Sequence, residues 1–342
     1  MMIEIDGAEG EGGGQIFRCA LGLATLTGKE IRVVNIRSNR PNPGLAGQHL
    51  TAVKGVAQLS DARVEGASIG SRELTFLPGK IKGGRYRLDI GTAGSVTLVL
   101  QACLLAACRS DSEITLELTG GTNVRWSPPV DFYEFVLLPL LDRMGMKVRM
   151  EVLLRGFYPE GGGRVVATIS PVKQLRQLDL EKRGDLIGVE GASFVQNLTK
   201  EVAQRMAIQV RKRIITTVPK VRVDVRQGRS AGAGVFLCAK YANTVLSGDS
   251  LGEKGIPSEK VADMAVDALQ KEMWSEASLD VHAADQLPPY MVLAGGPSRF
   301  RVRKMTGHMQ SQIDLILKFF DAWIEAEGKE GSIMIQVKPN RT

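Results

Sequence analysis

The chain contains few of the residues that metal centres and disulfide frameworks require. Its 342 residues include only 3 histidines and 4 cysteines. No two cysteines form a C-x-x-C pair and none is closely followed by a histidine, so neither a zinc site nor a disulfide framework is expected. We therefore expect reduced cysteines in a cytoplasmic protein. The four are Cys19, Cys103, Cys108 and Cys238.

Long apolar segments are also absent. The longest, residues 96–108, contains Gln101 and is too short to span a bilayer, so we expect a buried helix there and no membrane partner. The first residues lack the basic and apolar regions of a signal peptide. With 44% hydrophobic and 24% charged residues, the composition is typical of a soluble globular protein. The net charge of +7 permits a polyanionic partner but does not require one.

Glycine, in contrast, is abundant near the N-terminus, where five glycines between Asp6 and Gln15 surround Glu11. Such a turn lets backbone N–H groups approach a ligand closely, and the helical pattern that follows it provides an N-terminus that attracts phosphate. A carboxylate repels phosphate unless a divalent cation lies between them. The segment therefore predicts a nucleotide site with a metal ion, and a tight turn with a solvated Glu11 is the alternative. It matches neither the P-loop nor the dinucleotide fingerprint.

A pattern of turn, apolar helix and strand recurs along the chain. Small-residue turns at residues 12–14 and 91–95 each open an apolar helix, which is followed by a strand, a second helix and two alternating strands. The order returns near the C-terminus, where residue 284 opens a helix and His308 begins the last one. We predict an α/β (α+β) fold with three β-α-β-α-β-β-like repeats. The expected strands are residues 31–36, 62–65, 73–76, 113–118, 147–153, 163–169, 299–303 and 331–337.

Residues 185–276 interrupt the third repeat. They contain two further predicted strands and two predicted helices, which suggests a small inserted α/β domain. Residues 1–184 then form the large domain with repeats one, two and the start of three, and residues 277–342 complete it. The expected elements of the insert are strands 220–225 and 234–240 and helices 199–213 and 257–274. The role of this insert stays open.

His308 is the histidine best placed for catalysis. It follows Gly307 at the start of a helical pattern, where its imidazole would point toward anions at the helix N-terminus. A neutral imidazole is a good nucleophile toward phosphorus and a reversible group carrier. The alternative, a helix-capping or surface histidine, holds for most lone histidines.

Four other side chains suit phosphate binding. Arg37 and Arg40 follow a predicted strand and offer planar, bidentate capture of phosphates. Arg18 lies about one helical turn beyond the glycines. Gln48 lies on the next predicted helix, from which it can face the same pocket. Taken alone, Arg37 and Arg40 also fit a solvated basic loop.

Two further pairs of residues offer contacts to a nucleotide. Arg125 and Trp126 place a cation beside a flat ring, which suits an RNA base or phosphate, and a packed tryptophan is the alternative. Asp285 and Gln286 precede an apolar run and serve either as a helix N-cap pair or as nucleotide contacts.

Together, in order, these segments resemble the RNA 3′-terminal phosphate cyclase family. The resemblance implies three repeats like the C-terminal domain of bacterial translation initiation factor 3, with a small inserted α/β domain. It covers almost the whole chain and is carried by residues 6–18, 36–45, 48–53, 91–95, 156–163, 284–287 and 307–308.

The resemblance also implies an ATP-dependent reaction on RNA with a 3′-terminal phosphate. The histidine matching His308 takes AMP from ATP and passes it to the RNA phosphate, and the 2′-OH then closes a 2′,3′-cyclic phosphate. The position of Glu11 is associated with a divalent metal, Mg²⁺ or Mn²⁺. The positions implied for the phosphate side are Arg18, Arg37, Arg40 and Gln48. Those implied for the adenylate are Gln101, Pro129, His282, Ala283, Ala284, Asp285 and Gln286.

The chain departs from the family pattern at two positions. Bacterial members commonly have Tyr where this chain has His282, and often Asn where it has Gln312. One alternative within the fold is a non-catalytic cyclase-like factor of ribosomal RNA processing, against which His308 and the intact Glu11 and arginine set argue. The more distant alternative is an enolpyruvyl transferase. The physiological RNA, the preferred metal and a homo-oligomeric state stay open.

Overall fold

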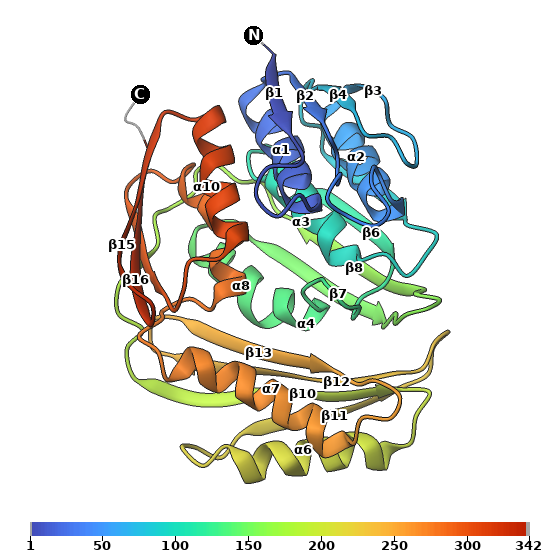
Figure 1. Cartoon of the computed structure of the whole chain (residues 1–342), viewed down its shortest axis with the longest axis vertical. Helices are drawn as coiled ribbons and strands as arrows, with labels where there is room; N and C mark the ends of the chain where they lie inside the picture. Colours follow the sequence, from blue (N-terminus) through green and yellow to red (C-terminus); the bar gives the residue numbers. More distant parts are fainter. Residues whose placement is uncertain (1, 340–342) are drawn as a thin grey trace.

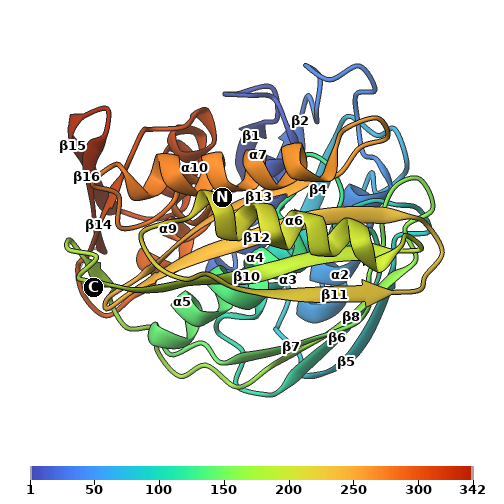
Figure 2. The same ribbon diagram turned by 90° about the horizontal axis from the view of Figure 1, so that it is seen from below.

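Four small mixed sheets and the helices packed on them make up the chain. The computed structural model describes residues 2–339. Each sheet has four strands, and the helices lie between and outside the sheets (Figures 1 and 2). The mixed α/β class predicted from the sequence is confirmed.

Three of the sheets share one strand order. In each, the first two strands are parallel and the other pairings are antiparallel. The first runs β1 (Ile3–Asp6), β2 (Ile31–Val34), β4 (Leu74–Leu77), β3 (Arg63–Glu65). The second runs β5 (Gly84–Asp89), β6 (Ile114–Gly120), β8 (Gly163–Ile169), β7 (Val148–Leu154). The third runs β9 (Asp179–Leu180), β14 (Ser298–Val302), β16 (Ser332–Pro339), β15 (Ala322–Lys329).

The helices of these three units pack into one hydrophobic core. α3 packs against both α1 and α2, and α1 also packs against α10, as Figure 1 shows. Every residue of α3 is buried except Gln101, which confirms the predicted buried helix. The helices are α1 (Gly14–Thr27), α2 (Gly47–Ser60), α3 (Val96–Ala107), α4 (Val130–Phe132), the π-helix η1 (Tyr133–Leu137), α5 (Leu138–Arg143), α8 (Val281–Ala284), α9 (Pro288–Met291) and α10 (Gly307–Phe319).

The segment from residue 284 is the main local correction to the predicted elements. We expect one helix there, but the chain forms two short ones, α8 and α9, separated by a turn. Pro288 and Pro289 stand at the start of α9, where their missing N–H groups cost nothing, but they could not continue α8.

The fourth sheet has a different order, β11-β10-β12-β13, and its own hydrophobic cluster with two helices. Figure 1 shows it in yellow-green to orange, below the rest of the molecule. The side chain of Phe236 faces the second unit, where it stacks on Phe135 with ring centroids 5.8 Å apart. The elements are β10 (Leu186–Gln196), α6 (Lys200–Arg213), β11 (Lys220–Arg226), β12 (Gly232–Tyr241), β13 (Val245–Leu251) and α7 (Ser258–Met273).

Within residues 2–339, no helix combines the length and the apolar character that crossing a membrane would need.

Gly22 allows α1 and α3 to approach closely. A Cβ atom added there would lie 2.8 Å from Leu105 Cδ2 and 2.9 Å from Leu105 Cβ, so the two helices would have to separate. We expect Gly22→Ala to lower the free energy of unfolding by about 1–3 kcal/mol, the usual cost of overpacking. Urea unfolding measures this. Gly188→Ala in β10 is the control because no atom lies within 4 Å of the added Cβ. Equal stability of the two variants would contradict this packing.

Candidate active site

The N-terminus of α10 meets the glycine segment at the N-terminus of α1. Thr306 caps α10 by accepting a hydrogen bond from the Met309 N–H at 2.9 Å, and His308 is the second residue of the helix. Gly10 lies under the same helix, with φ +61° and a missing Cβ that would collide with Ser311. Glycine is therefore required there both for its backbone conformation and for the close approach.

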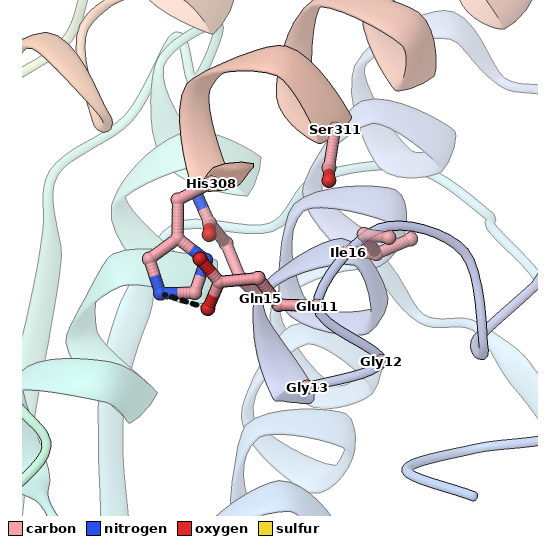
Figure 3. Close-up of a pocket in the computed structure, with 7 residues that line it drawn as sticks. All are labelled: Glu11, Gly12, Gly13, Gln15, Ile16, His308 and Ser311. Atoms are coloured by element: carbon pink, nitrogen blue, oxygen red, sulfur yellow. Dashed lines mark ion pairs between the residues drawn. The ribbon is translucent and has the colours of Figure 1, made fainter. Parts of the chain in front are cut away.

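His308 and Glu11 face each other across this junction. His308 Nε2 lies 3.3 Å from a Glu11 carboxylate oxygen (Figure 3). Burial, together with the charges of Arg18 and Arg40, lowers the pKa of His308, while Glu11 opposes that shift. The imidazole is thus kept neutral near pH 7, the state in which it is a nucleophile. The nearby Glu9 is bonded instead to Lys318, at 2.9 Å, so Glu11 is the carboxylate that faces the pocket.

Arg18 is a buried cation at the start of α1. It is 6% exposed, and its Nε donates a hydrogen bond to Gln101 Oε1 at 3.2 Å. Burial lowers its pKa to about 10. In the described part of the chain, neither Arg18 nor Arg37 nor Arg40 forms an ion pair with a carboxylate. A buried charge without a partner is costly, so Arg18, the buried one of the three, would be stabilised by an anion beside it.

Of the other predicted phosphate residues, Arg40 and Arg37 lie near the same helix start. A Cβ added to Gly13, the N-cap of α1, would lie 3.0 Å from Arg40 Nη2, which places this arginine at the helix end. Arg37 donates a hydrogen bond to the Gly44 carbonyl at 2.7 Å, which fixes its guanidinium. Gln48 has a different partner, because its Oε1 accepts from the Ser95 N–H at 2.8 Å and ties α2 to the N-cap of α3.

His49 is a site residue that the sequence analysis does not select. Its side chain lies over Gly14 beside Arg18. Burial and the charges of Arg18 and Arg37 lower its pKa to about 3, so it stays neutral. Its Nδ1 accepts from the Ala46 N–H at 3.3 Å, so Nε2 carries the proton and offers another donor at this helix start. Two sequence signals could have found it, the rarity of histidine in this chain and its place in the matched segment 48–53.

The residues predicted to hold the adenylate come from two short turns, except Gln101, which lies in α3 and bonds to Arg18. Buried Pro129 is the N-cap of α4. Gln286 lies 3.3 Å, Oε1 to hydroxyl, from Tyr133, which is four residues beyond Pro129. In α8, Ala283 and Ala284 are buried while the side chain of His282 is exposed. The bond to Tyr133 thus joins Gln286 to the helical segment that Pro129 begins.

Asp285 connects the α8 turn to both helices of the junction. Its Oδ1 accepts a hydrogen bond from the hydroxyl of Thr306, the cap of α10. Its backbone carbonyl accepts from Gln15 Nε2 at 3.4 Å. Burial raises the pKa of its carboxyl to about 7. Gln312, at a position where the family pattern often has Asn, is buried and binds Gln15 across the same interface at 3.4 Å.

Comparison with known proteins identifies the family. The family model described as RNA 3′-terminal phosphate cyclase matches residues 9–326. The chain belongs to this family. It is 44% identical to the RNA 3′-terminal phosphate cyclase of Methanopyrus kandleri, over 99% of both chains. It is 42% identical to the protein of that name from Nitrosospira multiformis, over 99% of this chain and 97% of the relative. The corresponding Archaeoglobus fulgidus protein is also 42% identical, over 96% and 99%.

The cyclase family implies ATP use, and ATP binds together with a divalent cation. The candidate site offers few ligands for such a cation. Among the residues that the structure describes, no three histidine, cysteine or acidic side chains gather around one point. Glu11 is half exposed at the pocket. A single carboxylate is enough for Mg²⁺ when substrate phosphates and water supply the remaining ligands, so the residues present fit a metal carried by the nucleotide.

Asp285 gives the site a measurable pH dependence. Because its pKa is raised to about 7 in the folded chain, the native state binds a proton that the unfolded state has released, and stability falls as pH rises from about 4 to about 7. Asp285→Asn keeps the acceptor for Thr306 but cannot ionise. We expect the melting temperature of this variant, relative to wild type, to increase between about pH 5 and 7.5 and to level off above pH 8. A difference that stays constant across this range would contradict the raised pKa.

Proposed function

We propose that this chain converts the 3′-terminal phosphate of an RNA into a 2′,3′-cyclic phosphate with ATP, through His308–AMP and RNA–adenylate intermediates. The observation that carries the proposal is the position of His308 at a helix N-terminus, 3.3 Å from Glu11 of the glycine segment and close to arginines that have no acidic partner among the described residues. Membership of the cyclase family supports the same chemistry.

The bond changes follow from the ability of imidazole to carry a phosphoryl group. An imidazole nitrogen of His308 bonds to the α-phosphorus of ATP, the bond to pyrophosphate breaks, and the ring loses its proton. An oxygen of the RNA 3′-phosphate then displaces the imidazole and forms a phosphoanhydride with AMP. Finally the vicinal 2′-OH attacks the 3′-phosphorus, AMP leaves and the ring closes. Attachment of AMP matters because a phosphate monoester has no good leaving group of its own.

The protein contributes charge and orientation to these steps. In the proposal, Arg18, Arg37, Arg40 and Gln48 bind phosphate oxygens. Gln101, Pro129 and the segment from His282 to Gln286 hold the adenylate. Glu11 would hold a Mg²⁺ or Mn²⁺ ion, which neutralises phosphate charge and polarises the phosphorus for attack.

The proposal extends to the fold and to the cell. We assign the three sheets of like strand order to repeats resembling the C-terminal domain of translation initiation factor 3. We assign residues 185–276 to a domain inserted into the third repeat, between residues 1–184 and 277–342. A cytoplasmic location accords with ATP use and with four cysteines that are all free and buried.

Covalent labelling tests the function. Wild-type protein incubated with α-labelled ATP and Mg²⁺ or Mn²⁺ should retain an acid-labile, base-stable AMP adduct, as a phosphoramidate does. His308→Ala should retain none, and Gln310→Ala, an exposed change on the same helix, should behave as wild type. A non-catalytic RNA-processing factor would never be labelled, and a label that persists in His308→Ala would place the nucleophile elsewhere.

Glu11 is tested through the metal dependence of the label. Glu11→Gln keeps the size and polarity of the side chain but removes the charge that a cation needs. We expect slower adenylation and a higher Mg²⁺ or Mn²⁺ requirement. If the rate and the metal titration match those of wild type, Glu11 is only a turn residue.

Arg37 and Arg40 are tested by comparing two steps. We expect Arg37→Gln or Arg40→Gln to slow cyclisation of a 3′-phosphorylated oligonucleotide roughly 10- to 100-fold, the effect of losing a charge-assisted hydrogen bond, and to slow self-adenylation less. Arg32→Gln, an exposed arginine of β2 that pairs with Glu4 and Glu73, is the control. Equal losses in both steps would assign Arg37 and Arg40 to ATP instead. An oligonucleotide ending in 3′-OH should not react.

A further inference from the structure

We propose that the β10–β13 sheet positions both turns of the adenylate site, so that residues outside the three like sheets determine how well ATP binds. The inference rests on the proposed function. It assigns Ser247 and Asp224 as positioning residues, although neither is expected to touch the nucleotide.

The first connection is a carboxylate shared between β13 and α8. Asp280 is completely buried. Its Oδ2 accepts hydrogen bonds from Ser247, from the backbone N–H at 2.9 Å and from the hydroxyl at 2.8 Å. Its Oδ1 caps α8 by accepting from the N–H groups of His282, at 3.1 Å, and Ala283, at 2.8 Å. One side chain therefore fixes the start of α8 relative to the edge strand of the other sheet.

The second connection reaches the turn that contains Pro129. Asp131, two residues further on, forms a bidentate pair with Arg155, with both contacts 2.7 Å long. Arg155 Nε lies 3.3 Å from Asp224 Oδ2 of β11, and its guanidinium lies 4.2 Å from the centroid of the Phe194 ring in β10. Arg155 and Asp131 are 2% and 0% exposed, so water does not weaken this pair.

A third, weaker connection joins the same turn to the end of β13. Arg125 forms an ion pair with Glu253, and both side chains are about half exposed. The charge of Arg125 is therefore paired with Glu253, which follows β13 of the fourth sheet. The neighbouring Trp126 is 95% exposed. Exposed ion pairs contribute little to stability, so we attribute the positioning to the two buried connections.

These connections matter because each one fixes the start of a helix. α8 has 4 residues, far fewer than an isolated helix needs, and α4 is the first turn of a helical segment that continues through η1 and α5. In Figure 1, α4 and α8 both lie next to β13. No hydrogen bond or ion pair within residues 2–339 links the β10–β13 sheet to the glycine segment or to α10. Loosening the sheet contacts should therefore disturb adenylate binding directly, and His308 only indirectly, through the bond between Asp285 and Thr306.

Two serines of β13 provide a matched test. Ser247 and Ser250 are 5% and 6% exposed, but only Ser247 bonds to Asp280, and the Ser250 hydroxyl has no partner among the described residues. The rate of self-adenylation is measured against ATP concentration for wild type, Ser247→Ala and Ser250→Ala. We expect Ser247→Ala to raise the half-saturating ATP concentration roughly fivefold, the value of one hydrogen bond, with the maximal rate and the KM for RNA little changed. Ser250→Ala should match wild type, and Ser247→Thr, which keeps the hydroxyl, should recover most of the loss.

A second pair of variants, outside β13, tests the same proposal if Ser247→Ala does not fold. Asp224→Asn weakens the contact to Arg155, whereas Asp263→Asn alters a carboxylate that bonds only within the same sheet unit, to Gln209 and Arg213. We expect only Asp224→Asn to raise the half-saturating ATP concentration. If Ser247→Ala and Asp224→Asn both keep the wild-type value, or lose maximal rate and melting temperature instead, the positioning role is wrong while labelling of the wild type still supports the function. Absence of labelling in the wild type itself would overturn both.

Discussion

The site depends on the meeting of two helix N-termini, those of α1 and α10, around a buried arginine. Both ends carry positive dipoles and unsatisfied N–H groups, and Arg18 adds a charge that no described carboxylate neutralises. This accumulation of positive potential is unfavourable unless an anion occupies the junction. Glycines make the approach sterically possible, and Asp285, Gln15 and Gln312 hold the helices together. Burial in the same field keeps His308 neutral, so anion binding and nucleophilicity have one origin.

The sequence predicts the elements that have a clear local period and misses those that do not. The helices that became α1, α3, α6, α7 and α10 bury one face or nearly all of their surface, and their apolar spacing identifies them. β5 is missed although its charged residues alternate with Tyr86 and Leu88, which is the period of a half-buried strand. β9 is only two residues long and exists through its pairing with β14. β1 and β10 are missed as well, and their sheet partners lie far away in the sequence. β13 and β15 are missed although each pairs with its neighbour in a hairpin, β13 with β12 and β15 with β16.

The candidate site shows the same division. The glycine segment and His308 are visible as motifs, and the structure brings them within hydrogen-bonding reach, although their catalytic roles stay predictions. Arg18 and Gln101 are predicted for different parts of the nucleotide, yet they bond to each other. Asp280 has no motif at all, and His49 lies in a matched segment that gives it no role. Their importance comes from contacts across the fold, between Asp280 and β13 and between His49 and α1. Composition and residue spacing do not predict such contacts.

The central claim is that a neutral His308 becomes the carrier of AMP. The most direct measurement is peptide mass spectrometry of the protein after incubation with ATP and Mg²⁺, before and after addition of a 3′-phosphorylated RNA. The account predicts one adenylyl group on the peptide that contains His308, and its loss as cyclic RNA ends form. An adenylyl group on another residue, or cyclic ends formed without any adenylated protein, would contradict it.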